Sequence, residues 1–457
     1  MPTVYLTAST PWIIRNFFHT GVVSRFAEIA DVVVFTTPHM REGLVRDGFD
    51  RIVEIHTLEN RPEPLPWKIS RQLRKKLYME MRGAETEALW EKFGSRTMAQ
   101  RLVGRAVAAS ADLLAGARTF ALLDRGDLLV NRSPAFRAMF RSRRPSVLFA
   151  TGVNSQFEES ISRSARAAGV PIVYMPSGWD HLSTKVVLSD VYDAVLTWTE
   201  IQREEAITTY PWLSAENVKT VGIPQFDAYA SGTPMSIAEW AAQYGLDPAR
   251  KTLVYFSMPQ VRHSDQHLIL EAAAEEIRVG GRLPRDLQIL IKCHPFDDNS
   301  VYEPLVSRYS NVGIQRTTLA PGADPLTWLP SPGEIESMRD TLSHADVTVN
   351  VYSTSTIEAA LFDKPIVHIA YDVRPLKNGR IPCREYYNFT HFRPVVAYGA
   401  SDLAYNQEEL YTFVSQALAD PSRHRKERRT LAAALGGPND GKSGDRVINA
   451  VMQAVSP

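Results

Sequence analysis

Short apolar runs alternate with longer helical patterns along the whole chain. The runs are rich in Val, Ile and Tyr and are nearly continuous in apolar character, as expected of parallel strands that are buried on both faces. The sequence therefore predicts an α/β protein in which helices cover parallel sheets. The predicted strands are 4–8, 31–37, 52–58, 146–152, 171–177, 194–199 and 218–223 in the first half, and 252–257, 287–293, 312–317, 346–352, 365–371 and 394–399 in the second.

The apolar periodicity is lost in QFDAYASGTPMS, residues 225–236, where Gly, Pro and Ser replace it. We expect this segment to join two Rossmann-like, doubly wound domains, 1–230 and 236–430, which face a central cleft that holds the active site. The remaining residues, 431–457, are expected to form a terminal helix that packs back toward the first domain.

Two connections are unusually long. The first, 68–145, has helical patterns without strand signals and holds 17 Lys and Arg against 7 Asp and Glu, although the formal net charge of the whole chain is zero. Such a basic segment is either a solvated helical face or a surface for an anionic membrane or a phosphorylated acceptor. The second, 317–334, is rich in Pro; its Trp328 either stacks on a base or sugar or packs the loop onto its domain.

The segment HADVTVNVYSTSTIEAALFDKPIVHIAYD, residues 344–372, reads as strand, helix and strand. The first turn of this unit carries Ser353, Thr354, Ser355 and Thr356, so hydroxyls and free N–H groups meet at a helix N-terminus, which favours a phosphate. Glu358 follows one turn later, where it could accept hydrogen bonds from a ribose. The alternative is that one of these hydroxyls only caps the helix.

A second element of this kind is LQILIKCHP, residues 287–295, a buried-strand pattern that ends in Lys292, His294 and Pro295. A cation and an imidazole then lie at the carboxyl end of a strand, the edge at which open α/β sheets bind ligands.

A His-Pro pair after one strand and a Ser/Thr cluster after a later strand resemble the C-terminal domain of GT-B glycosyltransferases. The resemblance is strongest to bacterial sialyl- and Kdo-type transferases and to CDP-glycerol phosphotransferases, and GWDHLSTK, residues 178–185, is also similar to surface-polysaccharide transferases of this fold. It implies that His294 and the Ser353–Thr356 cluster hold the phosphates of the donor. It also implies a site without a metal or other cofactor, so that Lys292, His294, Arg262 or the helix N-terminus neutralises the leaving group.

Arg262 and His263 are added to the predicted donor site because SMPQVRH, residues 257–263, follows the first strand of the second domain. The alternative for this segment is a loop with solvated charges.

Transfer to an acceptor hydroxyl requires a base, normally from the first domain. Asp180 and His181 follow a predicted strand, as do Glu158 and Glu159. We take Asp180 as the first candidate, although an Asp in a turn is often only a turn former.

Two other motifs are weak. GGPNDGKS, residues 436–443, fits the spacing of a phosphate-binding loop, but a charged helical pattern precedes it and only 14 residues follow Ser443, so we interpret 440–443 as the start of a terminal helix. FDDN, residues 296–299, places two carboxylates side by side without further ligands, which favours a surface turn over a metal site.

The composition limits the remaining possibilities. Two cysteines give neither a disulfide framework nor a zinc spacing, and no run reaches the roughly 20 apolar residues of a membrane span. We expect a cytoplasmic protein, with peripheral contact to the inner face of the membrane. The basic segment lacks interleaved aromatics, which argues against nucleic acid as a partner.

The sequence thus predicts a GT-B glycosyltransferase that moves a sugar from a nucleotide-activated donor to a surface glycan or a lipid-linked acceptor. The alternatives are a CDP-glycerol-type transferase of an alditol phosphate, a nucleotide-sugar 2-epimerase, and a non-catalytic nucleotide-binding or scaffold protein.

Overall fold

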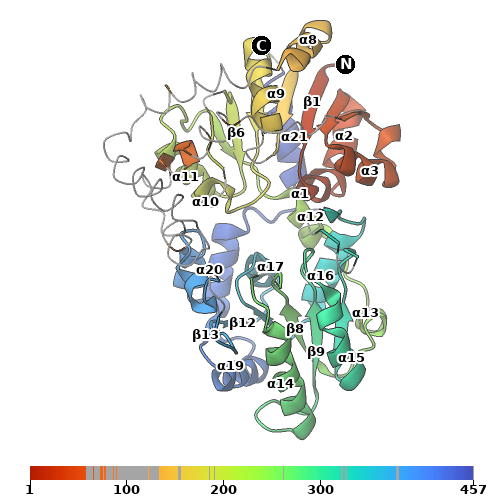
Figure 1. Ribbon diagram of the computed structural model, residues 1–457, viewed down its shortest axis with the longest axis vertical. Coiled ribbons are helices and arrows are strands. Elements are labelled where there is room, and N and C mark those ends of the chain that lie inside the picture. The colour runs from red at the N-terminus through yellow and green to blue at the C-terminus, as the bar shows by residue number, and fades with distance from the viewer. Residues whose placement is uncertain are drawn as a thin grey trace. The chain divides into compact units, whose positions relative to one another are not determined.

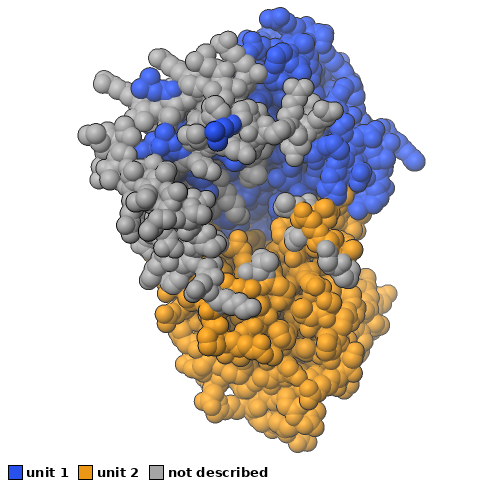
Figure 2. Space-filling model, in the orientation of Figure 1, with its two compact units in different colours: residues 1–84, 96–231, 437–457 blue, residues 85–95, 232–436 orange. Residues whose placement is uncertain are grey.

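The computed structural model describes residues 1–57, 133–152, 156–184, 186–189, 191–260, 262–320, 323–324, 327–376 and 380–455, with isolated positions between 58 and 132. The chain forms two compact units. Unit 1 comprises 1–84, 96–231 and 437–457, and unit 2 comprises 85–95 and 232–436 (Figures 1 and 2).

Unit 1 contains a seven-stranded parallel sheet of order β3-β2-β1-β4-β5-β6-β7. The chain builds the sheet outward from β1 to β3, returns to the other side of β1 with β4, and continues to β7. The order therefore reverses between β1 and β4, and the crevice at the carboxyl ends of these two strands is the expected place for a ligand. The strands are β1 (Thr3–Ala8), β2 (Asp31–Thr36), β3 (Glu54–Thr57), β4 (Val147–Ala150), β5 (Ile172–Tyr174), β6 (Ala194–Thr197) and β7 (Val218–Thr220).

The strands of unit 1 are covered by helices that bury one apolar face. One face of the sheet is filled by aliphatic and aromatic side chains of β1, β4, β5 and α9. The helical segments are α1 (Pro11–Ile13), the π-helix η1 (Ile14–Phe18), α2 (Val22–Ile29), α3 (Pro38–Arg46), η2 (Phe49–Arg51), α8 (Pro134–Ser142), α9 (Gln156–Ala167), α10 (His181–Thr184), α11 (Glu200–Thr209), α12 (Pro224–Ser231) and α21 (Ser443–Gln453).

The terminal helix α21 belongs to unit 1, where it packs against α2 and α12. The backbone N–H groups of Ser443 and Gly444 donate to the two carboxylate oxygens of Asp227, over 3.0 and 2.8 Å. A carboxylate therefore already occupies the anion-binding end of this helix, and the GKS sequence begins a helix without a strand before it. The interpretation of residues 440–443 as a helix start is confirmed.

Unit 2 contains a six-stranded parallel sheet of order β10-β9-β8-β11-β12-β13. Its order reverses between β8 and β11, so the carboxyl ends of these strands mark the corresponding crevice in this unit. The strands are β8 (Lys251–Phe256), β9 (Leu287–Lys292), β10 (Val312–Gln315), β11 (Val347–Asn350), β12 (Ile366–Ile369) and β13 (Asp402–Ala404). The helical segments are α13 (Ile237–Gln243), α14 (Gln266–Val279), η3 (Asn299–Val301), α15 (Glu303–Arg308), α16 (Glu334–His344), α17 (Ser355–Leu361), η5 (Cys383–Asn388), α18 (Arg393–Ala397), α19 (Gln407–Ala419) and α20 (Arg425–Leu435).

One predicted strand is wrong. Residues 394–399 are not a strand: Pro394 stands in the first turn of the short helix α18, where its missing N–H costs nothing. The strand β13 lies further on, at Asp402–Ala404, and pairs with β12. Most of the predicted basic insertion, residues 68–132, lies outside the described residues apart from isolated positions.

Candidate functional site

In unit 1 the crevice between β1 and β4 is closed by a buried carboxyl group. Glu158, in the first turn of α9, is 4% exposed, and its carboxyl group lies beside the side chains of Ser9 and Thr7 and the backbone of Gly152. Thr7 is at the end of β1 and Gly152 follows β4. Thr151 ties the same two strand ends together, because its N–H donates to Thr7 Oγ1 over 3.0 Å and its hydroxyl donates to the carbonyl of Thr7.

Burial dominates the chemistry of Glu158. It raises the pKa of this carboxyl to about 7, against the lowering effect of the polar groups of Ser9, Thr7 and Gly152 beside it. Position 152, beside this carboxyl group, requires a glycine, because a Cβ added at Gly152 would lie 2.0 Å from Glu158 Oε1. Both carboxylate oxygens of Glu158 are buried, so this group is enclosed within unit 1.

Glu159, the next residue in α9, lies in a different environment. Its carboxylate is buried between two guanidinium groups, 3.5 Å from Arg74 and 3.4 Å from Arg163. Successive helical residues point about 100° apart, so two adjacent carboxylates can have separate partners. Glu159 is therefore one member of a buried ion-pair network.

The turn after β5 carries Asp180 and His181. Gln202 donates to the carbonyls of Gly178 and Trp179, both over 3.1 Å, and Asn16 donates to the carbonyl of Ser177. Asn16 belongs to η1, which follows β1, so the turn after β5 is held against the segment after β1.

The two candidate side chains of this turn differ in accessibility. His181 is buried over Gly178, with its Nδ1 3.5 Å from Ser177 Oγ. Asp180 is only half-buried. Among the four residues predicted to serve in catalysis, Asp180 is thus the only one that is not buried.

In unit 2 the predicted His-Pro turn is held in place by the buried carboxyl group of Asp297, which acts through Ser257. The N–H of His294 donates to Ser257 Oγ over 2.8 Å, and the Ser257 hydroxyl donates to Asp297. Asp297 also accepts from Tyr302 over 2.9 Å, and burial raises its pKa. The prediction of a surface turn at 296–299 is therefore wrong for Asp297, which is buried because it organises the ends of β8 and β9.

Aromatic side chains cover the same turn. Phe296 lies edge-on to both His294 and Trp328, with ring centroids 5.4 and 5.9 Å apart. Trp328 is buried, so the alternative in which it packs the 317–334 loop onto its domain is confirmed. Lys292, the last residue of β9, is half-buried at this edge.

The hydroxyl cluster after β11 divides into two parts. Ser353 and Thr354 are half-buried, and Ser355 carries a buried hydroxyl that has no hydrogen-bond partner among the described residues. The hydroxyl of Thr356, by contrast, lies in the core 3.0 Å from His368 Nε2 and 3.3 Å from Asn350 Oδ1, and is not available to a phosphate. Glu358 is buried one turn into α17.

The loop after β8 also places its two predicted residues differently. Arg262 is exposed and interacts with Tyr386, whose ring stacks on that of Tyr352 after β11. His263 is buried and lies close to Asp372 and Cys383. The carboxyl edge of unit 2 therefore carries Arg262, Lys292 and His294 as well as the Ser353–Ser355 hydroxyls.

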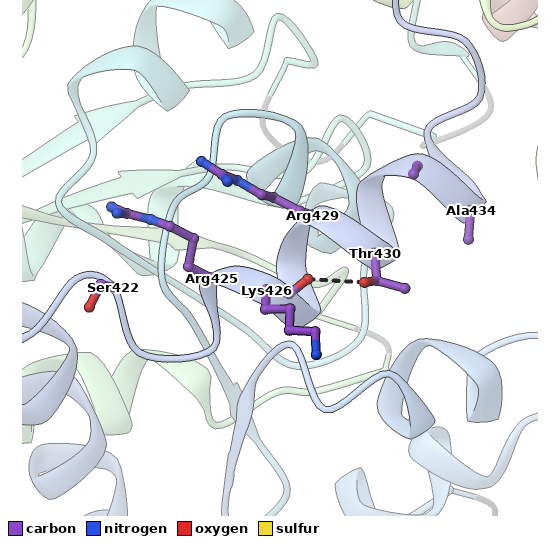
Figure 3. Close-up of a pocket in the computed structure, with 7 residues that line it drawn as sticks. Ser422, Arg425, Lys426, Arg429, Thr430 and Ala434 are labelled. Carbon is purple, nitrogen blue, oxygen red and sulfur yellow. Dashed lines mark hydrogen bonds between the residues drawn. The ribbon is translucent and has the colours of Figure 1, made fainter.

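A shallow depression of about 910 Å³ on α20 is lined by small and basic residues: Ser422, Arg425, Lys426, Arg429, Thr430, Ala433 and Ala434 (Figure 3). The side chains of Arg425 and Arg429 extend to the same side of the helix. Arg425 pairs with Asp363, which follows the end of α17 opposite to Ser355. The depression is therefore a feature of the helical surface, separate from the strand ends.

A family model described as CDP-glycerol:poly(glycerophosphate) glycerophosphotransferase matches residues 185–453. This match spans more than half of the chain and all six strands of unit 2. The chain belongs to this family. It is a transferase, and the predicted resemblance to CDP-glycerol phosphotransferases is confirmed. No curated protein sequence matches the chain significantly.

Solved structures place the transferase in the GT-B fold. UDP-GlcNAc 2-epimerase from Neisseria meningitidis is similar with a TM-score of 0.56 at 11% identity, covering 99% of this chain and 100% of the epimerase. The Methanocaldococcus jannaschii UDP-GlcNAc 2-epimerase gives a TM-score of 0.53 at 12% identity, with 99% of each chain covered. MnaA of S. aureus gives 0.53 at 11% identity, with 98% of this chain and 95% of MnaA covered. At such identities the likeness shows the shared fold.

Two groups of interacting residues in this transferase were not predicted from the sequence. Ser257, after β8, supports the His294 turn from another segment through Asp297 of that turn, and only the fold makes this link. The group His263, Asp372 and Cys383 is brought together from positions far apart in the sequence. The only hint of this support in the sequence was the position of Asp297 shortly after the His294-Pro295 pair.

Proposed function

We propose that this transferase moves a sugar from a nucleotide-activated donor to a surface glycan or its lipid-linked precursor. The second candidate is transfer of an alditol phosphate from a CDP-linked donor, which the family description favours. The observation that supports both is the family match over residues 185–453, because it covers the whole sheet of unit 2 and the edge that carries His294 and the hydroxyl cluster.

Unit 2 would hold the nucleotide. Ser355 supplies a buried hydroxyl without a partner among the described residues, next to the half-buried hydroxyls of Ser353 and Thr354. Hydroxyl and imidazole donors of this kind suit phosphate oxygens. Lys292 and Arg262 would offset the negative charge that develops on the leaving group, and Glu358 is retained as the candidate for the ribose.

Unit 1 would supply the base. Glu159 is engaged in ion pairs, Glu158 is enclosed, and His181 is buried, which leaves Asp180 as the group that can approach an acceptor hydroxyl. The role of His181 is then to pack over Gly178 and hold the turn.

We also propose that the transfer step needs no catalytic Mg²⁺ or Mn²⁺, because the cationic side chains at the edge of unit 2 can neutralise the leaving group. The measurement is turnover in buffer freed of divalent cations, compared with turnover after Mg²⁺ is added. Equal rates support the proposal, whereas a strict requirement for Mg²⁺ contradicts it.

The two candidate reactions break different bonds. Transfer of glycerol phosphate from CDP-glycerol breaks a P–O bond of the phosphoanhydride bridge and releases CMP, whereas transfer from a UDP-sugar breaks the anomeric C–O bond and releases UDP. Purified protein would be incubated with each donor and a lipid-linked glycan acceptor, and the nucleotide and the acceptor mass would be measured. Growth of the acceptor mass by glycerol phosphate with release of CMP assigns the second reaction; growth by a sugar assigns the first.

The same assay tests the other predicted classes. A 2-epimerase would convert the nucleotide-sugar without any change in acceptor mass, and a scaffold protein would release no nucleotide. Either result would contradict the proposed transfer.

We propose further that the protein acts at the cytoplasmic face of the membrane in peripheral contact with anionic lipid. No helix within the described part of the chain has both the length and the apolar character to span a bilayer. The support for contact is the basic segment 68–145 and the exposed Lys426 and Arg429 on α20. Co-sedimentation with anionic vesicles, but not with zwitterionic ones, is the expected result; equal behaviour with both would refute the contact.

A further inference from the structure

Three side chains that can bind a metal ion meet at the carboxyl edge of the sheet in unit 2. They are His263 in the loop after β8, Asp372 in the loop after β12, and Cys383 at the start of η5, and their ligand atoms all lie within 4.8 Å of one another. β8 and β12 are both neighbours of β11 in the sheet, so parallel pairing brings the two loops to the same edge.

The imidazole of His263 is the least satisfied member of this group. The side chain is 2% exposed, and its Nε2 is buried without a hydrogen-bond partner among the described residues. A buried polar atom without a hydrogen-bond partner destabilises the folded state. Such a cost is usually retained where the atom has a task, and a ring nitrogen beside a thiol and a carboxylate is a typical metal ligand.

We propose that His263, Asp372 and Cys383 bind a divalent thiophilic ion, with Zn²⁺ as the expected metal. One sulfur, one nitrogen and one oxygen ligand match the donors that Zn²⁺ takes in proteins. In a tetrahedral zinc site with bonds of about 2.0–2.3 Å the ligand atoms lie roughly 3.5 Å apart. The side chains therefore need to close by about one ångström, which rotamer adjustment can supply.

The charges at this position are compatible with a cation. The N–H of Cys383 donates to Asp372 over 3.0 Å, and the Cys383 thiol lies within 4.8 Å of a carboxylate oxygen of Asp372. Metal binding would displace the thiol proton to solvent, so a thiolate and a carboxylate would balance the charge of Zn²⁺. Asp265 lies near enough to add negative potential, against the positive charge of Arg380.

The consequence would be structural. One ion would join the loop after β8, which carries Arg262, to the loop after β12 and to η5, which carries Tyr386. Because a metal that binds only the folded state stabilises it by mass action, the bound form should unfold at a higher temperature.

Cobalt reports the site directly. Chelator-treated full-length protein would be titrated with Co²⁺, which gives a thiolate-to-metal absorption band in the near ultraviolet only when a cysteine is a ligand. We expect saturation at about one equivalent, competition by Zn²⁺, and a higher unfolding temperature with Zn²⁺.

Three variants test whether the cobalt band comes from this site and not from cobalt bound elsewhere on the protein. Cys383→Ser should abolish the band and Asp372→Asn should weaken binding at least about tenfold, with circular dichroism unchanged. Cys293→Ser is the matched control, because Cys293 is the other buried cysteine and lies outside the group; it should keep the band. No band in wild-type protein at equimolar Co²⁺, or a band that survives Cys383→Ser, would overturn the proposal.

Discussion

The two adjacent glutamates of α9 show how sharply one residue can differ from the next. Glu159 is neutralised by Arg74 and Arg163, whereas Glu158 is enclosed with hydroxyls and a backbone amide at the ends of β1 and β4. A carboxyl group in the second environment favours its protonated form, because desolvation penalises the charge. Glu158 is thus neutral in the folded protein at acidic pH, and its ionisation at alkaline pH destabilises the folded state.

We predict that Glu158→Gln raises the free energy of unfolding at high pH and leaves it nearly unchanged at low pH. The unfolded carboxyl ionises near its ordinary value of 4.5, but the folded one keeps its proton until its raised pKa of about 7. Stability is therefore lost as pH rises between these values, and the full loss, at most roughly 3 kcal/mol, is present above them. Tyr174 and Tyr192, which face this carboxyl, have raised pKa values and remain neutral.

Denaturant unfolding at about pH 4, below the unfolded pKa, and at about pH 8.5 measures this effect. Glu159→Gln is the control: it breaks buried ion pairs and should destabilise the protein at both pH values. A Glu158→Gln variant that is equally destabilised at both pH values would show that the carboxyl group is needed in its charged form.

The second prediction at this scale concerns the base. Asp180→Asn should lower turnover on the order of a hundredfold or more while donor binding is retained, since a base contacts the acceptor and not the nucleotide. Single-turnover rates and donor affinity are measured side by side, with the exposed Asp50→Asn as a control. Near-normal turnover would exclude Asp180 as the base, and loss of donor binding together with helical signal would make Asp180 a structural turn residue.

At the scale of elements, function depends on how strand ends are tied to one another. The turn after β9 that carries His294 is joined to the end of β8 through Ser257 and Asp297. The start of α21 is joined to α12 through Asp227. In both places a carboxylate satisfies backbone or hydroxyl donors that a loop alone would leave unpaired.

We predict that Asp297→Ala weakens donor binding by roughly tenfold and lowers stability by about 2 kcal/mol, because Ser257 and Tyr302 lose a buried acceptor. Asp297→Asn should recover part of the donor affinity, since an amide oxygen can still accept. The adjacent half-buried Asp298→Asn is the control. Donor affinity that stays at the wild-type level in Asp297→Ala would show that the turn holds His294 without this support.

For α21 we predict that Lys442→Ala changes neither nucleotide affinity nor turnover, because the exposed Lys442 begins a helix whose first N–H groups already bind Asp227. Asp227→Ala, by contrast, should lower stability by about 1–2 kcal/mol through loss of the cap. Binding of ATP and thermal unfolding of both variants are measured. ATP binding that disappears in Lys442→Ala would restore the phosphate-loop interpretation.

At the scale of the whole molecule, two sheets of the same doubly wound plan carry different chemistry at their carboxyl edges. Unit 1 gathers carboxyl groups, with Glu158 and Asp180 after β4 and β5, and unit 2 gathers cations and hydroxyls after β8, β9 and β11. Negative phosphates are expected at the second edge and an acceptor hydroxyl at the first.

We therefore predict that nucleotide binding depends on unit 2. A thermal-shift screen of CMP, CDP, UDP, GDP and dTDP should give stabilisation with one nucleotide class, by about 2.7 kcal/mol at a concentration one hundred times the dissociation constant. His294→Ala should reduce this shift, and His56→Ala, an exposed histidine of unit 1, should not. An unchanged shift in His294→Ala would place the nucleotide elsewhere.

The sequence by itself determined the elements of this protein and the strand ends that carry polar residues. Buried parallel strands produce continuous apolar runs, so β1 to β12 could be located from hydrophobicity alone, and the polar residues that directly follow a run, such as His294 and Asp180, could be named with them. The one wrong strand, at 394–399, failed because an apolar segment after Pro fits a short helix equally well.

Only the tertiary structure decided which of those polar residues are accessible and which are partners. Glu158 and Glu159 are indistinguishable in sequence, yet one is enclosed at a strand crevice and the other is paired with arginines. Thr356 and His263 turn inward, and Asp297 is buried, because burial depends on packing between segments distant in the chain. The meeting of His263, Asp372 and Cys383 has the same cause: strands β8 and β12 are separated by more than one hundred residues in sequence and by a single strand in the sheet.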